Sequence, residues 1–447
     1  MNPLLGQITL VLLFTVLFLP RRWAALGVVS GVIYVTQGDF LLLGGINFSS
    51  IRLIILAGFI RIIVRKEFSF TKLNKVDTSL LIFSSVYLIA FVLRSQLNPS
   101  SQSGLMYRFG QFCDGLLTYF IFRGLLKDPS MFRLFLKDLV FLVLPFTLFI
   151  TIEGIIGRNL FSIMGGVPEM PIIRDGYYRG QASFRHAITA GSFGATLLPL
   201  FIGLAFFAAT RFRAMIGIIL TILITIVSHS SSPLVAFACG VLAWMCWPLR
   251  ERMRMLRWVV IGLFVLLHMV MKAPVWFVFD RISGIIGGDG WHRSNLIDRF
   301  VKSFHDWWLL GMPIEKTINW APTSMSWGGV DVTNEYVSVG INGGLISLVL
   351  FIMLFWSCYQ SLGKAMRKIR SYTQNDRRNE ALLWGLGSAL FSHMINLTAV
   401  TYFDQFWVMW FMLLSVISGV TQHYLEDDYR LPFQVAGTEQ SVLKEIY

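Results

Sequence analysis

The sequence is poor in charged residues. Asp, Glu, Lys and Arg make up only 14% of its 447 residues, while hydrophobic residues make up 55%. A soluble domain carries about 25% charged residues. Apolar runs of roughly 20 residues, long enough to cross a bilayer, recur along most of the chain. Because these runs are continuous rather than alternating, they argue against a transmembrane β-barrel and predict an all-α, polytopic transmembrane helical bundle.

Several motifs that would indicate a cofactor are also missing. The histidines lack His-x-x-x-His spacing, so we predict no metal. The chain has no Walker-type loop and no Gly-x-Gly-x-x-Gly after a strand, so we predict no nucleotide cofactor. The 4 cysteines lie inside apolar runs, and no disulfide framework is expected. The energy for any reaction must therefore arrive with the substrate.

Acidic residues are fewer than basic ones, which gives a net charge of +13. A nucleic-acid partner would be one explanation. However, the basic residues concentrate in short segments between apolar runs, and a single alternation of sides places these segments in the cytoplasm. This is the charge bias that sets membrane topology. We therefore predict membrane lipids, and no nucleic acid, as the partners of this charge.

The apolar runs predict about thirteen spans. The first run lacks a basic residue before it and an Ala-x-Ala site, so it is expected to remain a membrane helix. The predicted organisation is N-terminal spans in 1–156, central spans with a first outer loop in 157–271, a large periplasmic loop in 272–335, C-terminal spans in 336–422 and a cytoplasmic tail in 423–447.

The large loop contains a segment with helical periodicity, Arg293 to Trp308. Apolar residues such as Leu296, Phe300 and Trp307 recur on one face, and polar residues occupy the other. The pattern predicts a helix that lies flat on the outer membrane surface, with its tryptophans at headgroup depth.

Arginines collect in the two outer loops, at Arg179, Arg185, Arg293 and Arg299. The guanidinium group is a rigid fork of donors, and two or three such forks can hold a pyrophosphate. The alternative is that these arginines pair with loop carboxylates or lipid headgroups. The serine-rich hinge 228–233 looks like a helix N-terminus, which is either an anion site or an ordinary capped turn.

Candidate general bases in the large loop are His292, Asp331 and Glu335, together with His305. Each of them alone could also be a solvated loop residue. His186, at the start of a span, is placed to orient Arg185 or to touch substrate.

Charged residues inside apolar runs are costly and usually have a function. Four such residues are candidates for the wall of an internal polar cavity: Arg108, Asp114, Glu153 and Asp404.

Three pieces of the chain resemble the O-antigen ligase and O-antigen polymerase group of bacterial polysaccharide polymerases, which are GT-C-type membrane glycosyltransferases. The first is Arg-Gly-Gln-Ala-Ser-Phe-Arg-His at 179–186, before a span. The second is the segment 293–312, an arginine followed by an aromatic helix and a glycine. The third is Thr-Asn-Glu-Tyr at 333–336, followed by Gly340, Gly343 and Gly344.

The resemblance implies an enzyme of the bacterial inner membrane that needs no cofactor. Its donor would be a lipid-linked oligosaccharide on undecaprenyl pyrophosphate, and its acceptor a glycan or lipid-A-core. Transfer would be inverting and metal-independent at the periplasmic face, with other polysaccharide assembly proteins as further partners. It implies that Arg179 or Arg185 and Arg293 hold the pyrophosphate, with Arg299 nearby.

The resemblance further implies that a loop base activates the acceptor hydroxyl. Candidates for the lining of the site are Arg108, His186, Asn334 and Tyr336. The sequence departs from the ligases at Thr333, where they have a histidine. The base is then Glu335, Asp331 or His292, or the chain is polymerase-like with another acceptor. Two rivals stay open: a transporter or flippase of lipid-linked oligosaccharide, and a non-catalytic relative that binds glycan.

Overall fold

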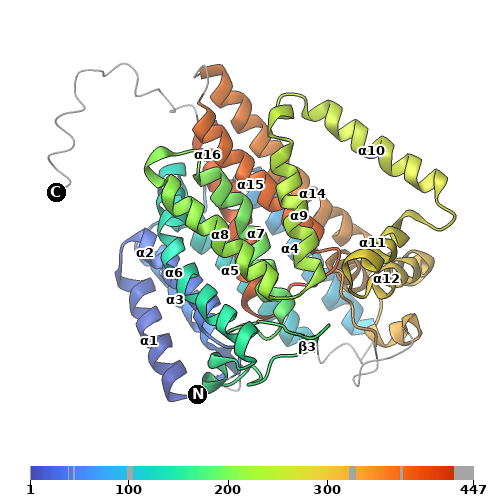
Figure 1. Ribbon diagram of the computed structural model, residues 1–447, viewed down its shortest axis with the longest axis horizontal. Helices are drawn as coiled ribbons and strands as arrows, with labels where there is room; N and C mark the ends of the chain where they lie inside the picture. The colour runs from blue at the N-terminus through green and yellow to red at the C-terminus, as the bar shows by residue number, and fades with distance from the viewer. Residues whose placement is uncertain are drawn as a thin grey trace.

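The computed structural model describes residues 2–38, 40–43, 46–97, 104–321, 329–372 and 376–426, and over these ranges the chain is almost entirely helical (Figure 1). Within them, 7 helices are long and apolar enough to cross a membrane. The chain is therefore a membrane protein. These helices, two of them counted with a preceding 3-10 turn, are α4 (Lys75–Leu97), α6 (Pro129–Ile156), α7 (Ala187–Leu204), α8 (Arg211–Val227), α10 (Met253–Val270), α14 (Glu335–Tyr372) and α16 (Trp407–Leu425).

Shorter or less apolar elements complete the described bundle. The further helices are α1 (Pro3–Phe18), α2 (Arg21–Tyr34), α3 (Ser50–Val64), α5 (Leu105–Leu125), α9 (Ser231–Met245) and α15 (Arg377–Asn396). Two antiparallel hairpins pair β1 (Phe40–Leu43) with β2 (Ile46–Ser49) and β3 (Ile173–Arg174) with β4 (Tyr177–Tyr178). The predicted tail from residue 423 begins inside α16, and residues 427–447 lie outside the described ranges.

The helix ends follow local sequence signals. Before α6, the side chain of Asp128 accepts a hydrogen bond from the backbone N–H of Met131 (2.8 Å), and Pro129 occupies the first turn. The helix ends at Gly157, which adopts the left-handed conformation with φ 70°. The same logic starts α15, where Asp376 caps the N–H of Asn379 (3.2 Å). Caps of this kind fix where the helices begin and end, and therefore where the polar segments between them lie.

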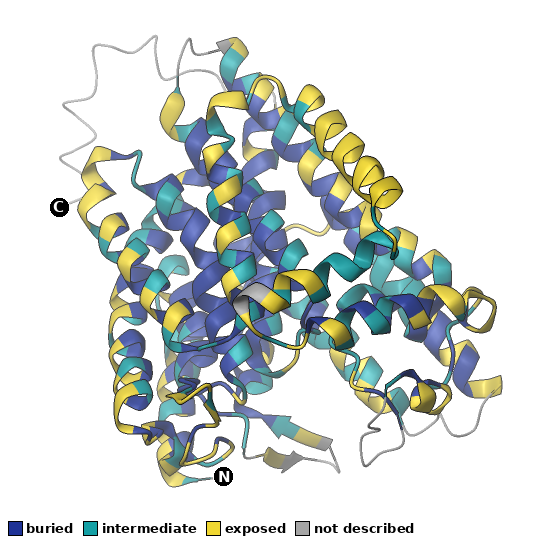
Figure 2. Ribbon diagram, turned by 45° about the vertical axis from the view of Figure 1, so that its right-hand side comes forward, coloured by how far each residue is buried: buried dark blue, intermediate teal, exposed yellow. Residues whose placement is uncertain are grey.

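The core is centred on α7, nearly all of whose residues are buried between α8, α9 and α15 (Figure 2). In contrast, α10 has no buried residue and stands clear of the other helices (Figures 1 and 2). An apolar helix that no protein covers can face lipid, because its backbone polar groups are hydrogen-bonded within the helix.

Buried charges are paired in the part of the bundle formed by α3, α4, α5 and α15. Arg61 pairs with Glu67 (2.9 Å) and Arg123 pairs with Asp77 (3.1 Å). Glu380 accepts from Arg250 (3.2 Å) and is also paired with Arg370. Because an unpaired buried charge costs several kcal/mol, these pairs explain how the membrane body tolerates its arginines.

The large segment 272–335 is folded rather than extended. It contains α11 (Val278–Ile286), α12 (Gly290–Lys302), α13 (Phe304–Trp307) and a 3-10 turn, η6 (Ile314–Trp320). The helix predicted across 293–308 is therefore divided at Ser303, which ends α12.

The predicted placement of this helix on the membrane surface was wrong for its apolar face. Leu296, Phe300 and Trp307 are buried in a small core together with Val337 and Ile341 of α14. The rings of Phe300 and Trp307 stack with centroids 4.0 Å apart. An amphipathic pattern requires an apolar surface opposite it but does not say which one. Here that surface belongs to α14.

A break in α14 receives the end of this segment. Gly344 has φ 75°, which only glycine adopts easily, and the helix changes direction there. Beside the break, the N–H of Met312 donates to the carbonyl of Ile341 (2.7 Å). Nη1 of Arg94, in α4, donates to the carbonyl of Met312 (2.8 Å) and to the carbonyl of Ile341 (2.7 Å). The segment is thereby fixed against α4 and α14.

Candidate functional site

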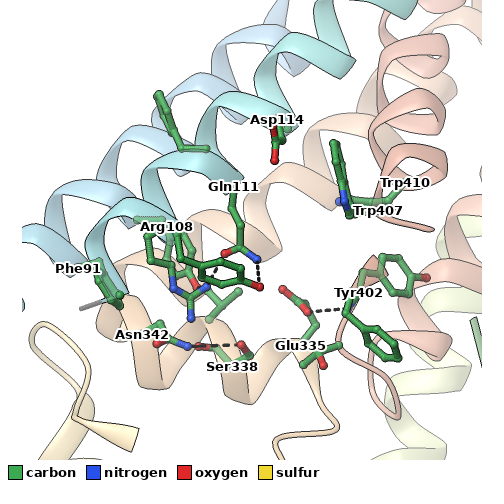
Figure 3. Close-up of a pocket in the computed structure, with 18 of the residues that line it drawn as sticks. Phe91, Arg108, Gln111, Asp114, Glu335, Ser338, Asn342, Tyr402, Trp407 and Trp410 are labelled. Atoms are coloured by element: carbon green, nitrogen blue, oxygen red, sulfur yellow. Dashed lines mark hydrogen bonds between the residues drawn. The ribbon is translucent and has the colours of Figure 1, made fainter. Parts of the chain in front are cut away.

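A cavity of about 1080 Å³ lies between α4, α5, α14 and the start of α16 (Figure 3). Its polar wall includes Arg108 and Gln111 of α5, and Glu335, Ser338 and Asn342 of α14. These residues come from segments more than 200 positions apart in the sequence. A concave site with a few convergent polar groups is where small-molecule and substrate binding usually occurs.

Glu335 stands at the first turn of α14. Its carboxylate accepts a hydrogen bond from the backbone N–H of Tyr402 (3.2 Å) and points into the cavity between Gln111 and Tyr402 (Figure 3). A carboxylate that has one oxygen fixed by a backbone donor is held in place for proton transfer. Of the four candidate bases, Glu335 is the one that lines this cavity.

Arg108 faces the same cavity from α5. Its Nη1 donates to Gln111 Oε1 (2.9 Å) and to the hydroxyl of Tyr87 (3.2 Å). The guanidinium carbon lies 5.3 Å from the ring centre of Phe91 and 5.7 Å from that of Tyr87. All of these partners are neutral.

Aromatic side chains make up much of the remaining wall. They come mainly from α4, α5, the segment before α16 and α16 itself, and include Phe91, Tyr107, Phe112, Tyr402, Phe403, Trp407, Trp410 and Phe411. Aromatic rings offer large apolar faces while their hydroxyl or indole N–H groups stay polar. This combination suits a ligand with apolar faces and polar edges, such as a sugar ring.

The segment 179–186 is held in place by two carboxylates, those of the buried Glu153 and the half-buried Asp404. Glu153 accepts hydrogen bonds from the N–H groups of Gln181 (3.1 Å) and Ala182 (2.6 Å). Asp404 accepts from the N–H of Arg185 (2.7 Å), and both Asp404 and Arg185 line the cavity. Glu153, predicted for the cavity wall, instead positions the backbone that carries Arg185.

A second group of arginines meets at the N-terminus of α9. Arg179, from the first polar segment, donates to Ser230 Oγ (2.7 Å), and Arg293, from α12, donates to Ser232 Oγ (2.7 Å). The Nε of Arg179 is buried without a hydrogen-bond partner within the described residues. The serine hinge, predicted as either an anion site or a capped turn, therefore binds two arginines.

Both arginines of this pair lie near the positive charge of Arg174, and Arg293 also lies near the carboxylate of Asp289. Burial lowers the pKa of Arg179, and the neighbouring Arg174 lowers it further. Burial also lowers the pKa of Arg293, with Asp289 opposing and Arg174 adding to the shift. The free amides of a helix N-terminus add to the attraction for an anion at such a site.

His186 lies between the two groups. Its Nδ1 accepts from the N–H of Ile188 (3.2 Å), which caps α7, and its ring contacts that of Phe403 in the cavity wall, with centroids 6.4 Å apart. Burial lowers the pKa of His186, and the charge of Arg179 lowers it further. His186 is thus close enough to Arg179 to interact with its charge, and it also contacts Phe403 of the cavity wall.

The other predicted residues have structural contacts. His292 Nε2 lies 3.0 Å from the carbonyl oxygen of Asp331, whose side chain is exposed. Asn334 accepts from the N–H of Val337 (3.1 Å) and donates to the carbonyl of Thr398. These residues fix the start of α14, and the cavity wall as described does not include them.

Two predicted residues remain. The hydroxyl of Tyr336 donates to the carbonyl of Met394 (3.1 Å), and its ring packs against Phe351. Arg299 is exposed on α12, and within the described residues it belongs to neither group. No three His, Cys, Asp or Glu side chains of the described ranges gather as a metal site requires.

Comparison with known proteins adds no identification. No family model matches the sequence, and no curated protein matches it either.

Proposed function

We propose that the chain is an inner-membrane glycosyltransferase that polymerises or ligates glycan carried on undecaprenyl pyrophosphate, acting at the periplasmic face to build O-antigen or exopolysaccharide. The observation that carries the proposal is the pair Arg179 and Arg293. Two distant segments bring these arginines to one helix N-terminus, where serine hydroxyls hold them instead of carboxylates. Their charge remains for a ligand, and a pyrophosphate matches two guanidinium forks.

Three buried or half-buried arginines elsewhere in the bundle differ from this pair, whereas buried Arg94 donates to backbone carbonyls. Arg61, Arg123 and Arg250 each form an ion pair with a carboxylate at 3.2 Å or less. Since burial of an uncompensated cation is costly, an arginine with neutral partners only is unusual in a membrane protein. A protein tolerates such a costly buried cation where the cation binds an anion.

The proposed reaction uses the two groups together. The donor's pyrophosphate binds Arg179 and Arg293, while the acceptor glycan lies in the aromatic cavity. The acceptor hydroxyl gives its proton to Glu335, and its oxygen attacks the anomeric carbon from the side opposite the pyrophosphate. The bond from that carbon to the pyrophosphate oxygen breaks, and the lipid diphosphate leaves with the electron pair. Stabilisation of this leaving group is the main catalytic contribution, and the anomeric centre is inverted.

The proposed membrane topology is consistent with a donor that binds at the periplasmic face. About thirteen crossings would place 157–186 and 272–335 in the periplasm and the basic connecting segments in the cytoplasm. The donor lipid would then reach the arginines from the outer leaflet.

The test replaces each arginine by glutamine, which keeps the side-chain length and removes the charge. Arg179→Gln and Arg293→Gln should each lower polymer formation about 10²–10³-fold, the usual cost of losing a donor to a developing negative charge. Polymer is measured by gel electrophoresis in a strain lacking its own copy of the gene. Arg281→Gln is the control, because Arg281 is exposed on α11 in the same outer segment.

A second readout does not depend on the natural substrate. Inorganic pyrophosphate should raise the melting temperature of the purified protein, and both variants should lose this increase while Arg281→Gln retains it. Normal polymer in both variants, together with an unchanged pyrophosphate effect, would contradict the proposal.

A further inference from the structure

We infer that the glycan bound in the cavity carries an acidic group, such as the carboxylate of a uronic acid, and that Arg108 recognises it. The inference rests on the proposed function for the identity of the ligand as a glycan, and it adds the chemical class of that glycan. It concerns the cavity between α4, α5 and α14, not the arginine pair on α9.

Arg108 is placed as a free cation in a ligand site. It is half-buried, lines the cavity and forms no ion pair with a carboxylate within the described residues. Its hydrogen-bond partners, Gln111 and Tyr87, are neutral, and the rings of Phe91, Tyr87 and Tyr107 surround its guanidinium at 5.3 to 5.9 Å. These contacts fix the guanidinium without neutralising it.

Three of the carboxylates that line the cavity accept hydrogen bonds from other groups, although Glu335 also interacts with the charge of Arg108 and Glu315 with that of Arg94. Asp114 is paired with Arg52 (2.8 Å), and Asp404 accepts from the N–H of Arg185 (2.7 Å). Glu335 accepts from the N–H of Tyr402 across the cavity. Arg108 is therefore, together with Arg185, a cation of this wall that a ligand carboxylate can pair with, and a planar guanidinium matches a carboxylate with two parallel hydrogen bonds.

The other wall residues favour a carbohydrate as the bearer of the acid. Trp407, Trp410 and Tyr402 present aromatic surface on the side opposite α5 (Figure 3). Asn342 and Ser338 add an amide and a hydroxyl to the wall of α14. A phosphate would need neither an aromatic surface nor amide side chains, and the arginine pair at α9 already offers a phosphate site.

The test measures binding of two soluble probes to the purified full-length protein by isothermal titration. One probe is tri-galacturonic acid, and the other is the same trisaccharide after its carboxyl groups have been reduced to alcohols. The wild type should bind the acidic probe at least about tenfold more tightly, which is the effect of one good charge-assisted contact. Arg108→Gln should bind both probes equally, and Arg108→Lys should keep part of the preference because it keeps the charge.

Arg158→Gln is the control, since Arg158 is exposed and paired with Glu169 away from the cavity wall. Melting temperatures of all variants show whether they are folded. Equal binding of the two probes by the wild type, absence of binding by the acidic probe, or a full preference in Arg108→Gln would overturn the inference. So would competition by inorganic pyrophosphate that disappears in Arg108→Gln, because the cavity would then be a phosphate site.

The inference and the proposed function fail separately. If Arg293→Gln abolishes polymer but the wild type does not distinguish the probes, only the acidic glycan is wrong. If the probes are distinguished through Arg108 but Arg179→Gln and Arg293→Gln make normal polymer, the cavity binds acidic glycan and the pyrophosphate chemistry is wrong.

Discussion

At the scale of single residues, the arginines divide by their partners. Those of the membrane body, such as Arg61 and Arg123, are neutralised by a carboxylate. Arg108, Arg179 and Arg293 are held by hydroxyl, amide and aromatic groups. The first kind stabilises the bundle, because removal of one partner would leave a buried charge. Arginines of the second kind form no ion pair with a carboxylate of the described residues, and their charges are those that we propose bind a ligand.

Glu335 gives the sharpest residue-scale prediction. Glu335→Gln should lower polymer formation by about 10²–10⁴-fold, the usual contribution of a general base. Glutamine keeps the oxygen that accepts from Tyr402 N–H but cannot take up a proton, so the fold should be retained. Polymer yield and melting temperature are measured together, with Glu169→Gln as the exposed control. Unchanged polymer would move the role of base to another residue.

Sequence reasoning could identify candidates at this scale but not their grouping. Arg179, Arg293 and the serine hinge were each recognisable from residue type and position. That both arginines bind the hinge depends on the tertiary structure that brings Arg179 and Arg293 to the start of α9, which no local pattern encodes. The aromatic wall, including Tyr402 and Trp407, was missed because aromatics in apolar runs are expected in any membrane helix.

At the scale of elements, the break in α14 is the feature against which the segment 272–335 packs. A Cβ added at Gly344 would lie 2.3 Å from the carbonyl oxygen of Leu309, and φ is 75°. Leu309 belongs to the turn after α13. The break and the turn are therefore shaped to each other.

Gly344→Ala should lower the free energy of unfolding by on the order of 1–3 kcal/mol, from left-handed strain alone, with the contact to Leu309 adding to it. Gly363→Ala is a matched control in the same helix, because a Cβ there meets nothing within 4 Å. Alanine is also the better helix former, so the control should be neutral or slightly stabilising. Melting temperatures of the two variants are compared in one detergent. Equal effects would show that Gly344 is not under this constraint.

The sequence predicted the helices of 272–335 better than their environment. The periodicity of Leu296 and Phe300 indicated an amphipathic helix, and α12 has one. The partner of its apolar face could not be read, since lipid and a neighbouring helix are equally apolar. The structure assigns that face to Val337 and Ile341.

At the scale of the whole molecule, the prediction concerns orientation. Residues 345–370 of α14 alone span roughly 40 Å at 1.5 Å per residue, more than the hydrocarbon core. The two ends of the helix should therefore lie on opposite sides of the membrane. The basic residues after its end predict that side to be cytoplasmic.

Alkaline phosphatase and green fluorescent protein, fused to chains truncated after Lys302 or after Arg370, test this arrangement. Phosphatase should be active only in the fusion after Lys302, because this enzyme needs the periplasm. Fluorescence should appear only in the fusion after Arg370, because green fluorescent protein needs the cytoplasm. The reverse pattern would invert the topology and remove the outward-facing site.

The class of the molecule was the part most easily predicted. Low charge and long apolar runs are global properties, and 7 membrane-length helices are found in the described chain. Helix ends were harder to predict, because α6 and α14 extend well into polar sequence that had been assigned to loops. Tertiary packing can prolong a helix past its apolar run, and the run alone does not report this.

The isolation of α10 has a practical consequence. A helix tethered only at its ends gains almost nothing from its own protein, so the bilayer alone decides its tilt and depth. Replacing lipid by a micelle would leave the interior of α7 intact while α10 drifts. Reconstitution into bilayer discs is therefore the setting in which the neighbouring segment 272–335, which follows α10 directly, keeps its native position relative to the bilayer.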